Sequence, residues 1–188
     1  MKIFKISHSS DAPGVHAVPD PGKFVKEVLF KLRQVGPDAE IGPFQLAEHD
    51  KVRAPFYKVS DSVLLFSEQV LLSPLGSILG FSGNVHFTSL LDSGEPLFFL
   101  NVTALYNCLN APKTLFRGLD GDQLGVDSQM GVSKYSFFSN LIGDSEVFKI
   151  PQVIGAIFFA CRSEDRCFQT LYGETGFKGL TFEQVWED

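Results

Sequence analysis

The densest run of strand-forming residues in the chain is LFFLNVT, residues 97–103. Its odd and even positions are both apolar, and Asn101 is the polar exception. Successive side chains of a strand point to opposite faces of a sheet, so this pattern predicts a strand that is covered on both faces. We therefore expect residues 97–103 to lie in the centre of a sheet, with Asn101 hydrogen-bonded to a buried backbone group.

A β-hairpin is predicted around this strand. NVHFTSLL, residues 84–91, has the composition of a strand, and DSGE, residues 92–95, has the composition of a turn. Further strands are predicted at residues 2–7, 52–59, 63–66, 146–150 and 156–160. Pro55 limits the strand at 52–59 to a sheet edge or a bulge, because proline has no backbone N–H to donate.

The helical signals are shorter. Apolar residues recur at helical spacing over residues 22–34, which predicts a helix there. Ser73, followed by a proline, predicts the start of a short helix that ends near Gly80. Ser163 predicts the cap of another helix, and Gly173 predicts its end.

These elements predict one α+β domain over residues 1–188, with a mixed or mainly antiparallel sheet and a few short helices. A chain of this length buries roughly 70% of the surface that it exposes when unfolded. Phenylalanine is unusually frequent, at 19 of 188 residues, and this favours a large aromatic core over an exposed aromatic patch.

The charge is uneven along the chain and narrows the choice of partner. The net charge is −6; residues 1–60 hold nine Lys/Arg and seven Asp/Glu, whereas residues 61–188 hold seven and fifteen. Acidic surfaces repel phosphates, so we expect no nucleic-acid partner, and a basic protein is favoured instead. The N-terminus lacks an apolar signal region, and no apolar run reaches the roughly 18–20 residues that a bilayer requires. We therefore expect a cytoplasmic protein with no membrane partner and with reduced thiols.

No motif for metal, nucleotide or hydrolase chemistry is present. The four histidines are scattered without metal-ligand spacing, and the phosphate-binding glycine loops and the nucleophile elbow are missing, so we expect no metal and no cofactor. Cys108 and Cys161 lie in or beside apolar runs and are predicted to be buried, inert thiols, as is Cys167 on the apolar face of a helix. A Cys/His site assembled from distant residues stays open as an alternative.

One acidic loop is a further candidate site. Asp120, Asp122 and Asp127 lie in LDGDQLGVDS, whose spacing does not match an EF-hand. Three interpretations remain open for this loop: a solvated acidic segment, a weak cation site, or a contact surface for a basic partner.

The segment 98–114 carries a family resemblance. It has the order aromatic-aromatic-aliphatic-Asn-Val followed by Cys-Leu, and the residues that match are Phe98, Phe99, Leu100, Asn101, Val102, Cys108 and Leu109. In this order and spacing the segment resembles a block of bacterial immunity proteins from polymorphic-toxin systems. Asn110 stands where that family usually has Asp, and Thr114 lies near the position of its Ser.

Two further blocks are similar to the same family. The segment VLLFSE, residues 63–68, resembles its strand ending in Ser-Glu, and residues 147–186 resemble its C-terminal order of Phe-Lys-Ile, strand, helix and Gly-x-x-Gly-Leu-x-Phe. The resemblance covers about residues 50–188, and its motifs are structural rather than catalytic.

This resemblance implies a protein of bacterial competition that binds a cognate toxin and neutralises it by occluding its active site, without catalysing a reaction. Loop position and residue type make Asp120, Asp122 and Asp127 the candidate toxin contacts, with Tyr135 and Phe137 as aromatic anchors. Two other functions remain open: a small cytosolic enzyme with a Cys/His site, and a regulatory module that forms homo-oligomers. The sequence does not indicate the oligomeric state.

Overall fold

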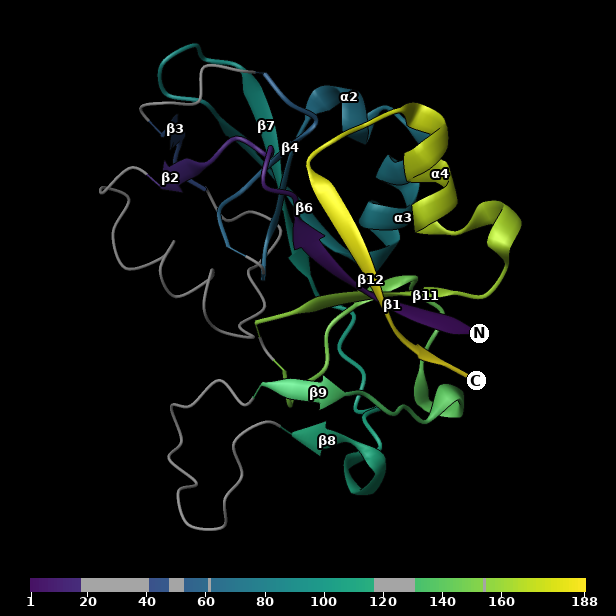
Figure 1. Cartoon of the computed structure of the whole chain (residues 1–188). Helices are drawn as coiled ribbons and strands as arrows, with labels where there is room; N and C mark the ends of the chain where they lie inside the picture. The colour runs from purple at the N-terminus through teal and green to yellow at the C-terminus, as the bar shows by residue number, and fades with distance from the viewer. Residues whose placement is uncertain (18–40, 48–52, 61, 117–130, 154) are drawn as a thin grey trace, which may run out of the picture.

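The computed structural model describes residues 1–17, 41–47, 53–60, 62–116, 131–153 and 155–188. The fold is α+β: within these residues, two four-stranded and two two-stranded antiparallel sheets accompany three short α-helices (Figure 1). The predicted fold class is therefore confirmed. The helix predicted at 22–34 and the acidic loop with Asp120, Asp122 and Asp127 lie outside the described residues.

The first four-stranded sheet contains the strand from which the sequence analysis began. Its order is β4-β5-β7-β6, and its strands are β4 (Phe56–Tyr57), β5 (Leu64–Ser67), β6 (Gly83–Ser89) and β7 (Pro96–Val102). The predicted hairpin is confirmed, since Asn84 pairs with Asn101 and Phe87 with Phe98 in an antiparallel register. The central position of β7 and the edge position of β4, which follows Pro55, are confirmed as well.

The second four-stranded sheet joins the two ends of the chain. Its order is β10-β11-β1-β12, and its strands are β1 (Lys2–His8), β10 (Val147–Phe148), β11 (Ile157–Cys161) and β12 (Leu180–Glu187). β1 pairs with both β11 and β12, and the backbone N–H of Asp188 donates to the carbonyl of Met1 at 3.1 Å. Both termini accordingly lie close together in Figure 1.

Two smaller sheets flank these. One pairs β2 (Val15–Ala17) with β3 (Phe44–Leu46), and the other pairs β8 (Leu115–Phe116) with β9 (Val132–Lys134). Three single 3₁₀ turns complete the described elements: η1 (Ala111–Lys113), η2 (Ser139–Leu141) and η3 (Glu164–Arg166).

The helices are α2 (Glu68–Leu71), α3 (Pro74–Ser82) and α4 (Phe168–Thr175). The predicted cap of α3 is confirmed, because the Ser73 hydroxyl accepts the backbone N–H of Leu75 at 3.2 Å. The predicted ends of α4 are wrong. Its N-cap is Cys167 rather than Ser163, and it continues past Gly173 to Gly176, whose φ of 67° gives the left-handed conformation that ends a helix.

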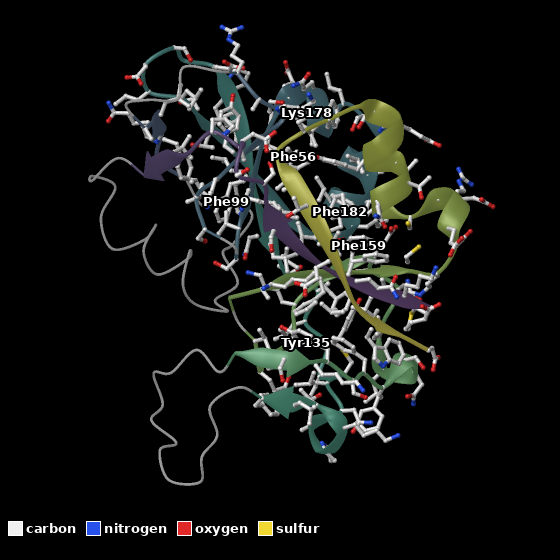
Figure 2. The ribbon with its side chains drawn as sticks, viewed as in Figure 1. Phe56, Phe99, Tyr135, Phe159, Lys178 and Phe182 are labelled. Atoms are coloured by element: carbon white, nitrogen blue, oxygen red, sulfur yellow. The ribbon has the colours of Figure 1, made fainter. Side chains whose placement is uncertain are left out.

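The core has three parts because the strands of both sheets are covered on two faces. In β11, Ile157 and Phe159 point into the cluster between the two sheets and helices α2 to α4, whereas Phe158 points into a cluster on the other face. In β7, Leu100 joins the first cluster and Phe99 joins one against β2 and β3. Figure 2 shows this division for Phe159, which lies near β12 and α4, and for Phe99, which lies on the opposite side of the first sheet.

Candidate functional site

Tyr135 and Phe137, the predicted aromatic anchors, lie in the core. Their exposed fractions are 9% and 4%, their rings stack with centroids 5.9 Å apart, and both meet Phe158 of β11 edge-on. Figure 2 places Tyr135 beside β9, at the end of the molecule away from α4. The alternation of Tyr135 and Phe137 is the signal of an inward-facing extended segment, which the serines around them obscure. Both rings therefore belong to the core of this structure.

Cys108 is the most deeply buried thiol. It has no exposed surface, and burial raises the pKa of its thiol to about 11. A thiol of this kind stays protonated and unreactive at neutral pH, because the thiolate is the nucleophile. The predicted burial of Cys108 is confirmed.

Cys161 and Cys167 lie beside each other at the junction of β11 and α4. Cys161 is the last residue of β11 and Cys167 is the N-cap of α4, and the two thiols are close enough for each to shift the pKa of the other. Both are buried, with 5% and 3% of their surface exposed, but residues 162–166 between them are all exposed. Two thiols therefore meet under a short surface segment that connects a strand with a helix.

The two thiols differ in acidity. Burial raises the pKa of the Cys161 thiol to about 12, and the neighbouring Cys167 and the nearby carboxylates act in the same direction. Burial also acts to raise the pKa of Cys167, but the neighbouring Cys161, the Thr170 side chain and the backbone N–H groups of Gln169 and Thr170 outweigh it and lower that pKa. The positive end of α4 favours the same ionisation. Cys167 is thus the more acidic of the two thiols.

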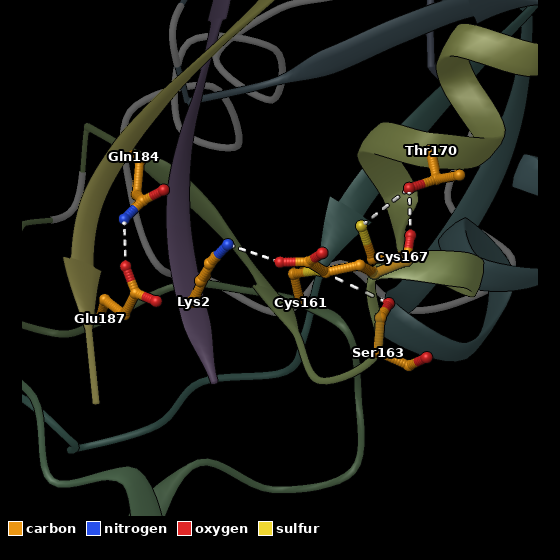
Figure 3. A network of polar contacts seen from close by, with 8 residues as sticks. Lys2, Cys161, Ser163, Cys167, Thr170, Gln184 and Glu187 are labelled. Carbon is orange, nitrogen blue, oxygen red and sulfur yellow. Dashed lines mark hydrogen bonds and ion pairs between the residues drawn. The ribbon is translucent and has the colours of Figure 1, made fainter.

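Thr170 links this pair to the surface turn. Its hydroxyl donates to the Glu164 carbonyl at 2.5 Å and lies 3.5 Å from the Cys167 sulfur, while the Cys161 thiol lies 3.5 Å from the Ser163 carbonyl (Figure 3). A hydroxyl has one proton to donate, so the neutral Cys167 thiol donates to the Thr170 oxygen. Ionisation of Cys167 reverses this bond, since the hydroxyl must then leave the Glu164 carbonyl to reach the sulfur.

Charged groups surround the pair. The Glu146 carboxylate accepts the first backbone N–H of α4, from Phe168, and burial raises its pKa in spite of that bond and of Arg162 nearby. At the surface, Lys2 of β1 forms an ion pair with Glu164 at 2.5 Å (Figure 3). The first of these contacts holds the start of α4 to the residue before β10, and the second holds η3 to β1.

The described side chains provide no assembled metal or Cys/His centre. No three of the described His, Cys, Asp and Glu residues are grouped as metal ligands. The groups that shift the pKa values of the three thiols are thiols, carboxylates, a hydroxyl and backbone amides, and none of them is a histidine. The chemistry that this arrangement supports is that of a thiol pair.

A second feature lies on the surface, at the edge strand β6. No described strand pairs with the outer edge of β6 over residues 83–87. Phe87 on this strand is 66% exposed, and its ring meets Phe98 edge-on with the centroids 5.9 Å apart. Phe81, at the end of the preceding helix α3, is 84% exposed. Edge strands and exposed aromatic rings are both features by which proteins bind other proteins.

The acidic excess extends to the described surface. The described part of residues 62–188 holds eleven Asp/Glu and six Lys/Arg. Four of the exposed acids lie on α4 and in the C-terminal strand and residue: Glu174, Glu183, Glu187 and Asp188.

Comparison with known proteins gives no family for this chain. No protein-family model matches it, and no curated protein matches it either. Within the described residues, no helix combines the length and the apolar composition needed to cross a bilayer.

Proposed function

We propose that this chain is an immunity protein, which in the cytoplasm binds a cognate bacterial toxin and neutralises it by covering its active site, without catalysis of its own. The proposal rests on the resemblance of residues 50–188 to immunity proteins of polymorphic-toxin systems. The residues that carry the resemblance at Phe99, Leu100 and Cys108 are buried. They therefore belong to the scaffold, and the toxin contacts lie elsewhere.

The edge strand β6 is the observation that supports a protein partner most directly. Phe87 and Phe81 expose large aromatic surface on and beside the edge strand β6. Interface energy concentrates in a few aromatic residues of this kind. The negative charge of the surface favours a basic toxin face, because complementary potentials raise the association rate.

The loop with Asp120, Asp122 and Asp127 stays a second predicted contact, on its sequence alone. In the native protein, charge reversal at Asp120 and Asp122 together should weaken toxin binding and change its salt dependence. Unchanged affinity at both low and high salt would remove this loop from the interface.

The test uses the reading frame next to the gene for this chain, which this proposal predicts to encode the toxin. Expression of that toxin alone should stop growth, co-expression of this chain should restore it, and the two proteins should co-purify. Phe87→Ala should weaken binding at least about tenfold, which is the loss expected for an aromatic anchor. Phe138→Ala is the matched control, because Phe138 is 43% exposed at η2 in another part of the sequence, and it should bind as the wild type does.

The outcomes separate the claims. Growth arrest that this chain does not relieve would overturn the proposed function. Rescue with equal affinity for Phe87→Ala and Phe138→Ala would keep the function and exclude the β6 edge. A dimer in sedimentation that Phe87→Ala dissociates would assign the edge to a second copy of this chain instead.

A further inference from the structure

The thiol pair at the start of α4 has no role in the proposed toxin binding, and packing alone does not account for it. Cys108 shows what a purely structural thiol looks like in this chain: it has no exposed surface, and burial is the main influence on its pKa. Cys161 and Cys167 are instead neighbours that shift each other's pKa, and the five residues between them in the sequence, 162–166, are all exposed.

We infer that Cys161 and Cys167 form a peroxide-sensitive modification site that closes to a disulfide. The Cys167 sulfur lies at the N-terminus of α4, where the helix dipole and the backbone N–H groups of Gln169 and Thr170 stabilise negative charge on it. The Cys161 thiol is a close neighbour of that sulfur, since each shifts the pKa of the other, so the second reactant is in place before oxidation begins. This is the arrangement of an attacking thiolate next to a resolving thiol.

The reaction balances with hydrogen peroxide as the oxidant. The Cys167 thiolate attacks one peroxide oxygen, the O–O bond breaks, and hydroxide leaves and takes up a proton, which gives Cys167 sulfenic acid and water. The Cys161 thiol then attacks the sulfenic sulfur, an S–S bond forms, and a second water leaves with the Cys161 proton. Overall two thiols lose two electrons and peroxide gains them.

Access is through residues 162–166, all of which are exposed and of which Glu164–Arg166 form a single 3₁₀ turn. Short surface segments of this kind open locally far more often than the core does, and peroxide is a small molecule. The Lys2–Glu164 ion pair and the bond from Thr170 to the Glu164 carbonyl hold the turn closed in the reduced protein (Figure 3).

The experiment treats the native, full-length protein with hydrogen peroxide and counts free thiols after denaturation. The wild type should lose two of its three thiols and become lighter by two hydrogen atoms, with Cys108 still free. Trypsin cuts after Arg162 and Arg166, so the disulfide should join two separate peptides, residues 150–162 and 167–178. That joined peptide is direct evidence for the proposed bond.

Three variants assign the roles. Cys161→Ala should stop at Cys167 sulfenic acid, which a sulfenic-acid probe such as dimedone traps. Cys167→Ala should leave Cys161 reduced, since that thiol has no acidic partner left. Cys108→Ala is the matched control and should form the disulfide at the wild-type rate.

Two results on the wild type alone would overturn the inference, whatever the variants do. One is loss of Cys108 at the same rate as the other two thiols. The other is survival of all three thiols at peroxide concentrations that oxidise the urea-unfolded chain.

Discussion

Replacement of Lys149 by methionine should make the protein more stable, and the gain should depend on pH. Lys149 follows β10, where its backbone N–H donates to the Ala104 carbonyl at 2.9 Å and its carbonyl accepts from Tyr106 at 3.0 Å. Its side chain is 8% exposed, and burial lowers the pKa of its amine from 10.5 to about 8. Methionine has a similar length and no charge to desolvate.

The size and sign follow from this pKa. A lowered lysine pKa means that the unfolded chain binds more protons than the folded one between pH 8 and 10.5, so stability rises with pH across that window. Below pH 8 the Lys149 amine is charged in the folded protein as well, and its burial then lowers the free energy of unfolding by about 3 kcal/mol, at 1.36 kcal/mol per pKa unit. Lys149→Met should therefore raise the free energy of unfolding by up to about 3 kcal/mol at pH 7. The difference between the variant and the wild type should be smaller by about 2 kcal/mol at pH 9.5.

Urea unfolding followed by the fluorescence of Trp186, the single tryptophan, measures both values. The control is Lys134→Met on the exposed face of β9, which should change the free energy of unfolding by less than about 0.5 kcal/mol at either pH. A Lys149→Met variant that is less stable than the wild type, or a gap of equal size at both pH values, would show that the buried amine has a stabilising partner and refute the reasoning.

Two further predictions concern packing. Gly76→Ala should lower the free energy of unfolding by about 1–3 kcal/mol, because the new Cβ would lie 1.9 Å from the Leu71 carbonyl oxygen. Gly80→Ala in the same helix places its Cβ where no atom lies within 4 Å, so it should raise the free energy of unfolding by up to about 1 kcal/mol. Equal effects of the two variants in thermal unfolding would contradict this. Phe159→Ala should lower the free energy of unfolding by about 3–5 kcal/mol, since the centroid of the Phe159 ring lies 4.8 Å from that of Phe4 and 5.5 Å from that of Phe182. Phe87→Ala should lower it by less than about 1 kcal/mol. A large loss for Phe87→Ala would make it unfit for the binding test.

The sequence predicted those parts of the fold that depend on local pattern. The β6–β7 hairpin followed from two apolar runs and a turn, and the cap of α3 followed from Ser73 before a proline. The pairing of β1 with β12 did not, because two short amphipathic strands separated by most of the chain leave no local trace of their contact. The start of α4 was misplaced since Ser163 is a good cap by residue type, yet the five exposed residues form a turn and Cys167 takes the cap position.

The candidate sites divide in the same way. Burial of the three cysteines was predictable from the apolar runs around them, but the contact between Cys161 and Cys167 was not. It depends on where β11 ends and where α4 begins, which are the boundaries that pattern fixes least well. Had the helix begun at Glu164, as predicted, Cys167 would have belonged to its interior and its sulfur would have had no free N–H groups to face.

Asn101 is the residue of the resemblance block at which local rules and the fold disagree. It is 9% exposed near one end of the β6–β7 pair, and its side-chain nitrogen is buried with no hydrogen-bond partner among the described residues, so that nitrogen does not make the expected bond to backbone. An unsatisfied buried donor lowers stability by about 1–3 kcal/mol. The pairing of seven residues of β7 with β6 and the burial of the apolar side chains on either side of Asn101 must offset this loss. A shift of that register by one residue would turn every apolar side chain of β7 to the opposite face. The penalty at Asn101 is therefore tolerated because the hairpin around it has one strongly preferred alignment.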